Sequence, residues 1–400
     1  MGRYGIVILV LFSFIITLFS CGRSPQTIAT VGKEKITITE FQDLLKQKKP
    51  RKQLSQISFE ERKKVLMNHL EGRAKAMKAK ELKLNEDPDL QVQLRRREER
   101  VLAAKYPEIL IVEKFVTPEM IQAFSGIQTS KPRIITVALG YEGSKLIQFS
   151  RSREEAVTLA DQIYQRVKEG EDIAELSAQY TDNPNLKKQK GLYDPYTAGA
   201  LDPAVDVRVN QAEKSEIIAP IETDRGIFVI EILDKDDSAR VALSENQRNR
   251  IRINIYNKFY RTQGDTIYKN LSEKFRSELG GEIFDDGIDE FLLAIEAWAA
   301  TPNPTDPTFT ETQKAIVLGR IADITITAGY FIDEFQGTFR TSYQLFNSHD
   351  ELKKVLMDYI ERYLAWITKA REAGIDRLPE VQKLLQQFLD SKLVELFDKN

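Results

Sequence analysis

Hydrophobic and polar positions form their clearest pattern in the middle of the chain. Two largely β-branched apolar runs, at residues 134–139 and 226–233, predict buried strands. Between them, residues 154–168 place apolar side chains three and four positions apart, which predicts one face of a helix. Residues 173–180 predict a second, shorter helix. The order of strand, helix, short helix, irregular loop and strand predicts an α+β domain at residues 131–236.

Before this domain, the pattern predicts a mainly helical segment at residues 28–125. Alternation on both sides of Gly32-Lys33 predicts a β-hairpin, and Thr39 is the predicted N-cap of a helix that starts at Glu40. Three further helix starts are marked by a capping box or an early proline: Ser58-Phe59-Glu60-Glu61, Pro88 and Thr117-Pro118.

After the α+β domain, residues 244–281 repeat apolar side chains at multiples of four. They predict one long helix with its bend at Gly264 and its end at Gly280-Gly281. Residues 282–309 are expected to hold a helix and then a linker, because three prolines fall within their last eight positions.

Residues 310–400 echo the segment at 28–125, which indicates an internal repeat. Two pairs of stretches show it best: Ser58-Phe59-Glu60-Glu61-Arg62-Lys63-Lys64-Val65-Leu66-Met67 with Ser348-His349-Asp350-Glu351-Leu352-Lys353-Lys354-Val355-Leu356-Met357, and Pro88-Asp89-Leu90-Gln91 with Pro379-Glu380-Val381-Gln382. A single-residue gap joins the two blocks. The alternative is that unrelated amphipathic helices converged, but a colinear series with matching caps favours two copies of one segment.

The C-terminal copy has a wide apolar helix face within residues 352–367, and such a face requires a partner. The equivalent helix of the N-terminal copy is the expected partner. The predicted architecture is therefore a mainly helical module built from both chain ends, with the α+β domain inserted between them.

The first twenty residues have the form of a signal peptide. A short basic start precedes an apolar run at residues 6–19, which is too short to span a bilayer of ~30 Å as a helix. Leu18-Phe19-Ser20-Cys21 then resembles a bacterial lipobox, so Cys21 is the expected site of lipidation and residues 21–27 a tether. An incidental cysteine is the alternative. Cys21 has no partner for a disulfide, because the chain contains one cysteine.

Composition adds exclusions. The chain has 400 residues, of which 42% are hydrophobic, and a formal net charge of −2, so nothing indicates a nucleic-acid partner. The sequence has no phosphate-binding loop, no nucleophile–base–acid set and no metal-ligand spacing. We therefore expect neither a cofactor nor a metal.

The segment Gly170-Glu171-Asp172-Ile173-Ala174-Glu175-Leu176-Ser177-Ala178-Gln179-Tyr180-Thr181-Asp182-Asn183-Pro184 resembles the parvulin domain of peptidyl-prolyl isomerases. Ala219-Pro220-Ile221-Glu222-Thr223-Asp224-Arg225-Gly226 resembles the turn before the last parvulin strand. The opening phrase from Ala29 to Phe41 is similar to the start of SurA- and PrsA-type chaperones. These resemblances imply an FKBP-like β-α-β domain inserted in a SurA-type helical module.

The parvulin resemblance also implies a site, and the sequence departs from it. Active parvulins carry one histidine in the first strand and one in the last, which fall at Ile134 and Phe228 here. The apolar pocket residues fall at Leu201 and Val205. The chain's two histidines, His69 and His349, lie elsewhere. The resemblance implies a substrate-binding surface at these four positions with no catalytic residue, and hence a lost or weakened isomerase activity.

The sequence as a whole favours a lipid-anchored, extracytoplasmic chaperone, in the periplasm or on the outer membrane. Its partners would be unfolded or partly folded secreted and outer-membrane proteins. Two alternatives stay open: an active parvulin-type isomerase, and a surface lipoprotein that binds one fixed partner.

Overall fold

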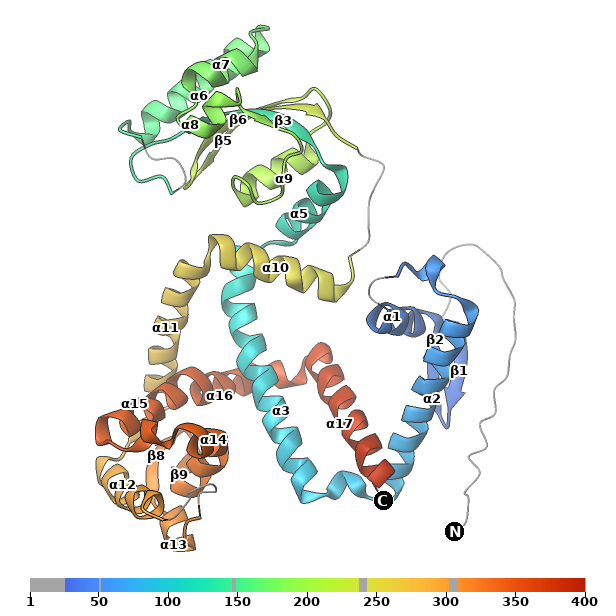
Figure 1. Ribbon diagram of the computed structural model, residues 1–400, viewed down its shortest axis with the longest axis vertical. Helices are drawn as coiled ribbons and strands as arrows, with labels where there is room; N and C mark the ends of the chain where they lie inside the picture. The colour runs from blue at the N-terminus through green and yellow to red at the C-terminus, as the bar shows by residue number, and fades with distance from the viewer. Residues whose placement is uncertain (1–25, 50–51, 146–148, 237–242, 302–307, 400) are drawn as a thin grey trace. The chain divides into compact units, whose positions relative to one another are not determined.

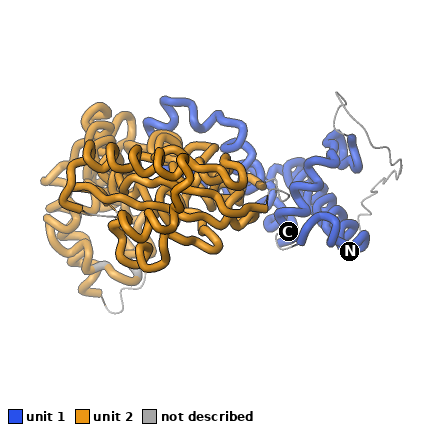
Figure 2. The backbone as a smooth tube through the Cα atoms, turned by 90° about the horizontal axis from the view of Figure 1, so that it is seen from above, with its two compact units in different colours: residues 1–104, 367–400 blue, residues 105–366 orange. Residues whose placement is uncertain are grey.

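The computed structural model describes residues 26–49, 52–145, 149–236, 243–301 and 308–399. Signal peptide and Cys21, predicted at the N-terminus, lie outside the described residues. The chain divides into two compact units, residues 1–104 with 367–400 and residues 105–366, which Figure 2 colours separately. Among the helices described, none is both long and apolar enough to cross a membrane.

The first unit starts with a hairpin and three helices. Its elements are β1 (Thr27–Val31), β2 (Glu34–Thr37), α1 (Ile38–Lys48), η1 (Leu54–Gln56), α2 (Phe59–Glu81), η2 (Leu84–Glu86) and most of α3 (Pro88–Pro107). The C-terminal helix α17 (Pro379–Lys399) packs along α2 around the buried side chains of Ala76, Ala79, Leu90 and Leu393. Two exposed ion pairs join the same helices, Lys75 with Asp398 at 2.9 Å and Lys80 with Asp390 at 3.2 Å. Both chain ends therefore contribute to one helical unit.

The hairpin confirms the predicted turn but moves the helix start. Thr37, not Thr39, is the N-cap of α1, because its side chain accepts a hydrogen bond from the Glu40 N–H at 3.2 Å. β2 therefore ends at Thr37, two residues before the predicted N-cap. Ser58 and Glu61 form the predicted capping box at the start of α2.

The C-terminal copy repeats the element order of the N-terminal copy. Its elements are β8 (Val317–Ile321), β9 (Ile324–Thr327), α14 (Ala328–Ser342), η4 (Tyr343–Phe346), α15 (His349–Tyr359), η5 (Ile360–Leu364), α16 (Ala365–Glu372), η6 (Ile375–Arg377) and α17. Equivalent hydrogen bonds recur at 2.8 Å in both hairpins: Ile38 N–H donates to the Gln26 carbonyl, and Ala328 N–H donates to the Ile316 carbonyl. The two segments therefore share an element order and a hydrogen bond at the hairpin.

The single-residue gap in the repeat has a structural cause. α2 is one continuous α-helix, whereas the equivalent stretch of the C-terminal copy contains the π-helical turn η5 at Ile360–Leu364. A π-turn takes up one extra residue without breaking the helix. The inserted residue of the C-terminal copy is thus absorbed between α15 and α16, and both copies resume register before Pro88 and Pro379.

The apolar face at residues 352–367 has a different partner from the one predicted. Within the second unit, Leu352, Leu356, Ile360 and Leu364 are buried against Phe275, Ile288 and Phe291. These last three side chains belong to α11 (Arg261–Glu278) and α12 (Asp285–Ala299), with β7 (Glu282–Ile283) between the two helices. An apolar stripe does not specify its partner, and here the helices between the two repeats cover it.

The predicted long helix at residues 244–281 is two helices. α10 (Glu245–Phe259) ends at Tyr260, whose backbone is not helical, and α11 follows directly. Gly264 lies inside α11, where an added Cβ would lie 1.8 Å from the Tyr256 hydroxyl. The glycine therefore makes room for a side chain of the preceding helix and does not mark the break.

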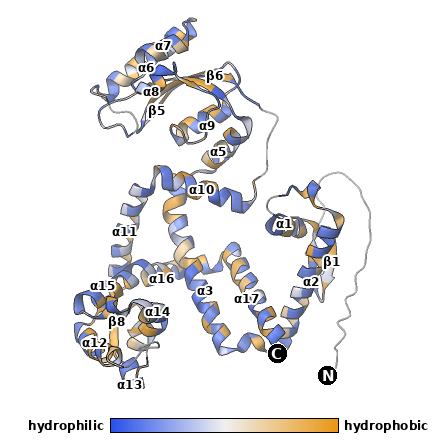
Figure 3. Cartoon of the chain, in the orientation of Figure 1, coloured by the Kyte–Doolittle hydropathy of each residue, from blue (hydrophilic) through white to orange (hydrophobic). Residues whose placement is uncertain are grey.

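The predicted α+β domain forms around a four-stranded antiparallel sheet. Strand order is β4 (Leu192–Tyr193), β3 (Arg133–Leu139), β6 (Gly226–Asp234), β5 (Ile217–Thr223). In Figure 3, β6 is among the most hydrophobic segments of the chain. The helices of this domain are α5 (Pro118–Ser130), α6 (Arg153–Lys168), α7 (Ile173–Tyr180), α8 (Pro184–Lys188) and α9 (Pro203–Gln211). The two sheet faces bury separate cores, one against α6 and α7 and one against α5 and α9 (Figure 1).

Candidate functional site

The four predicted site residues belong to one apolar core. Ile134 and Phe228 come from β3 and β6, Val205 comes from α9, and Leu201 comes from the loop before it. All four side chains are buried in the core between the sheet, α5 and α9. The structure thus brings the four together as packed interior rather than as the lining of an open cleft.

The strand register separates Ile134 from Phe228. Ile134 lies opposite Ile232, whereas Phe228 lies opposite Ala138, four positions further along the ladder. At about 3.3 Å per residue this is a separation of roughly 13 Å along the strands. Thr136 shares the face of Ile134 and Ala138 and is the diagonal neighbour of Phe228. Thr136 is therefore the polar β3 side chain placed to act together with position 228, and the sequence argument did not single it out.

A second buried polar group lies where Leu201 and Val205 meet the sheet. The Asp206 carboxylate accepts a hydrogen bond from the Tyr196 hydroxyl at 2.7 Å and another from the Gly199 N–H at 2.7 Å. Burial raises the pKa of Asp206 to about 6, and burial also raises the pKa of Tyr196. The sequence offered one signal: an aspartate three positions into a helix of otherwise apolar face residues. This network fixes the loop that carries Leu201.

The end of α10 covers the same loop. The Arg225 guanidinium donates to the Leu201 carbonyl at 2.8 Å and lies 5.0 Å from the centre of the Phe259 ring. Phe124 of α5 and Phe259 of α10 both approach Gly199. A client could reach Leu201 or Val205 only after the core around them opens, because both side chains are buried.

β4 pairs with β3 at Ile134 and Ile135. Further along the same edge, β3 is hydrogen-bonded to α7 and the residues after it. The Thr181 hydroxyl accepts from the Ala138 N–H at 3.2 Å, and the Asp182 N–H donates to the Ala138 carbonyl at 3.0 Å. The Ser177 hydroxyl donates to the Thr136 carbonyl at 2.8 Å. Each of these groups is hydrogen-bonded to β3, so their role is to position this strand.

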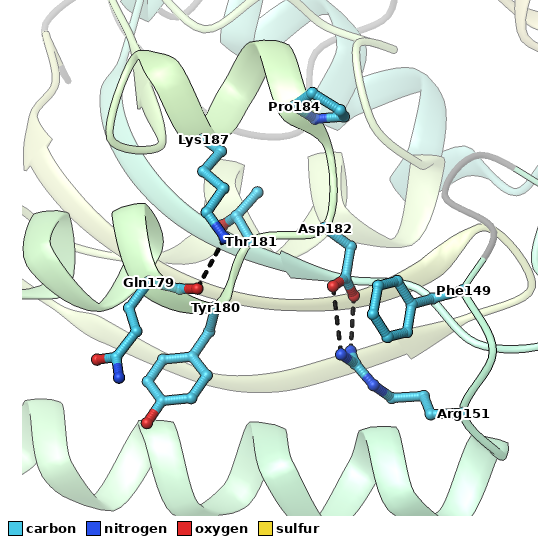
Figure 4. A pocket seen from close by; sticks show the side chains of 8 residues that line it. All are labelled: Phe149, Arg151, Gln179, Tyr180, Thr181, Asp182, Pro184 and Lys187. Carbon is cyan, nitrogen blue, oxygen red and sulfur yellow. Dashed lines mark hydrogen bonds and ion pairs between the residues drawn. The ribbon is translucent and has the colours of Figure 1, made fainter.

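A pocket of about 310 Å³ lies beside this edge, away from the four predicted residues. Its lining is mostly polar: Phe149, Arg151, Gln179, Tyr180, Thr181, Asp182, Pro184 and Lys187. Figure 4 shows Arg151 paired with Asp182, at 2.6 and 3.2 Å, and Lys187 donating to the Gln179 carbonyl at 2.8 Å. Arg151 and Asp182 are paired with each other and Lys187 is bonded to a backbone carbonyl, so this pocket does not replace the predicted apolar surface.

Comparison with known proteins identifies the sheet domain. A family described as the PPIC-type PPIASE domain matches residues 126–236. The chaperone SurA of Pseudomonas savastanoi pv. phaseolicola is 32% identical over 95 residues, and SurA of Pseudomonas putida is 30% identical over 92 residues. Each match covers 22% of this chain and 22% of the relative, so the chain spans about a fifth of the length of these relatives.

Two solved structures are also similar. PrsA from Bacillus anthracis, a peptidylprolyl isomerase, is 13% identical with a TM-score of 0.27, and the match covers 57% of this chain and 91% of PrsA. The PPIase domain of TbPar42 is 18% identical with a TM-score of 0.24, and the match covers 26% of this chain and 99% of that domain. Residues 126–236 therefore match the PPIC-type PPIASE domain, and the chain is similar to SurA chaperones over about a fifth of its length.

Proposed function

We propose that the protein is an extracytoplasmic chaperone that holds unfolded or partly folded secreted and outer-membrane proteins, anchored by a lipid on Cys21. The observation that supports this most strongly is a parvulin-type fold whose site face carries Phe228 where active parvulins carry a histidine. Thr136, its polar diagonal neighbour, is not an imidazole either. The fold is retained, but neither Ile134 nor Phe228 is the histidine that the parvulin resemblance implies.

Apolar surface is sufficient for holding a client. Burial of an apolar side chain contributes ~25 cal/mol per Å², whether or not a prolyl bond rotates. Ile134, Leu201, Val205 and Phe228 would supply such surface once the core that buries them opens. A surface of this kind binds ground and transition states equally, and uniform binding does not raise a turnover rate.

A working prolyl isomerase is the second candidate, favoured by the family match over residues 126–236. Rotation about an X-Pro bond needs no covalent chemistry, so an apolar site that desolvates the bond could give weak catalysis. A lipoprotein with one fixed partner is the third candidate, and client breadth distinguishes it from a chaperone.

Aggregation assays with several unrelated denatured proteins test the proposal. We expect the purified chain to slow light scattering of each client at near-stoichiometric amounts, because apolar recognition does not depend on one sequence. Suppression for one client and for no other would contradict the chaperone proposal and favour the fixed-partner lipoprotein.

The anchor has its own test. Cys21→Ala should leave the protein without lipid and move it from the membrane fraction to the soluble fraction, because the thiol is the atom that receives the lipid. Mass spectrometry of the mature wild-type protein provides the positive measurement. A mature chain with an unmodified Cys21, or one that retains residues 1–20, would rule out the anchor. Ser20→Ala, next to the thiol, is the matched control.

A further inference from the structure

Positive charge is concentrated in one stretch of the N-terminal copy. Residues 46–64 contain eight basic residues and two acidic ones, in a chain whose net charge is −2. The equivalent stretch of the C-terminal copy, residues 336–354, contains three basic and two acidic residues. The two stretches share one fold, so the difference in charge does not follow from folding requirements.

The lysines of this stretch are exposed at the end of α1 and on α2. Lys46, Lys48, Lys63 and Lys64 are all exposed. Lys52 and Lys49 both bond to Glu61, at 2.9 and 3.2 Å, and Lys52 first among them holds the pKa of Glu61 at about 2. Lys46 lies 3.7 Å from the exposed Asp43 carboxylate, and the lysines still outnumber the carboxylates, so this surface is net positive.

Exposed apolar side chains lie among the lysines. Phe59 is 55% exposed and Met67 is 37% exposed, each four residues from Lys63 on α2. Residues four apart share a helix face. The equivalent of Phe59 in the C-terminal copy is His349, so the aromatic side chain is also specific to the N-terminal copy. Large apolar side chains among lysines are typical of surfaces that insert at a bilayer interface.

The short stretch of chain between Cys21 and β1 would keep this surface close to the membrane. β1 begins at Thr27, six residues after Cys21, and a fully extended chain spans at most ~3.5 Å per residue. A lipid on Cys21 would therefore hold the start of β1 within roughly 20 Å of the bilayer. α1 has 11 residues, or about 16 Å, and leads from there to the lysines.

We propose that Lys46, Lys48, Lys63, Lys64 and Phe59, the basic surface, bind the anionic headgroups of a bilayer directly. The inference rests on the proposed anchor for its geometry but not for its chemistry. Contact of lysines with phosphate lays the first unit against the membrane, and Phe59 enters the interface. The lipid and the basic surface are then two attachments that act together.

The test uses the unlipidated chain that starts at Gly22, so that an acyl chain contributes nothing. We expect it to sediment with vesicles that contain about one third phosphatidylglycerol and not with pure phosphatidylcholine vesicles. Raising salt well above ~0.1 M should release it, since the Debye length then falls below ~10 Å. Lys48→Glu with Lys63→Glu and Lys64→Glu should weaken binding more than ten-fold.

Matched variants separate the surface from net charge. Lys168→Glu with Lys188→Glu and Lys269→Glu makes the same charge change at exposed positions of the second unit, and it should bind like the unmodified chain. Phe59→Ala should weaken binding several-fold without altering the salt dependence. Circular dichroism melting confirms that each variant folds.

Two outcomes would overturn the proposal: equal loss of binding in both triple variants, or no binding to anionic vesicles. If the chain does not bind vesicles but the same lysines retain an acidic unfolded protein, the surface is assigned to clients. Failure of the proposed anchor would be detected separately, by mass spectrometry of the mature wild-type protein. The vesicle result would not be affected, because that assay uses the unlipidated chain.

Discussion

The purified protein should isomerise a Xaa-Pro tetrapeptide at least a hundred-fold more slowly than an ordinary parvulin, measured as kcat/KM. Each factor of ten is about 1.4 kcal/mol of transition-state stabilisation, so the expected deficit is roughly 3 kcal/mol. The physical reason is the site face: Phe228 is fully buried among Ala138, Ile230 and the α9 side chains, with no imidazole beside it. A protease-coupled or NMR exchange assay provides the measurement.

Substitutions of Phe228 test this prediction further. Phe228→His alone should restore no activity, because its diagonal neighbour is Thr136 rather than a histidine and the position is buried in the core. It should also lower stability, since an unpartnered imidazole in an apolar core costs about 1–3 kcal/mol. Phe228→Leu is the control for packing. A kcat/KM of the wild-type chain close to that of a parvulin would show that the histidine argument is wrong.

Local patterns predicted most of the secondary structure because their causes are local. The strands at 134–139 and 226–233 fall within one residue of β3 and β6, and the predicted capping box at Ser58 forms. The internal repeat was also visible, since equivalent caps and hairpins require equivalent residues. Even the one-residue gap was visible, although its cause, the π-turn at η5, was not.

Tertiary partners were less predictable from sequence. The face at residues 352–367 was assigned to the wrong helix, because many amphipathic helices could cover an apolar stripe equally well. The break at Tyr260 was placed at Gly264, since a glycine in a helix signals a bend in sequence but here makes room for Tyr256. Burial of the four site residues depends on α5 and α10, which lie outside the parvulin resemblance.

Strand register could not be predicted from the single sequence either. Ile134 and Thr136 both point to the site face, because side chains alternate along a strand. Choosing between them needs the position of β6 against β3, which only the paired strands supply. The structure places Ala138 opposite Phe228 and Thr136 diagonal to it, whereas Ile134 lies opposite Ile232.

Asp206→Asn should make the protein progressively more stable than wild type as the pH rises from about 4 to above 6. In the folded chain the pKa of Asp206 is raised from 3.8 to about 6 by burial. A raised pKa means that the native state binds the proton more tightly than the unfolded state. Its stabilising contribution is therefore complete below pH 3.8 and is lost as pH rises through 6.

Two pKa units at about 1.4 kcal/mol each give a loss of roughly 3 kcal/mol in wild type across this window. Asparagine carries no charge to desolvate, and its side-chain oxygen can still accept from the Gly199 N–H while its amide donates to the Tyr196 oxygen. Urea unfolding of both proteins at a series of pH values measures the difference. Asp161→Asn, on the exposed side of α6, is the control and should show no such pH-dependent gain. If the difference in free energy of unfolding between the two proteins stays constant from pH 4 to 7, Asp206 is not the group that titrates. The Tyr196–Asp206–Gly199 network would then not account for any pH dependence of stability.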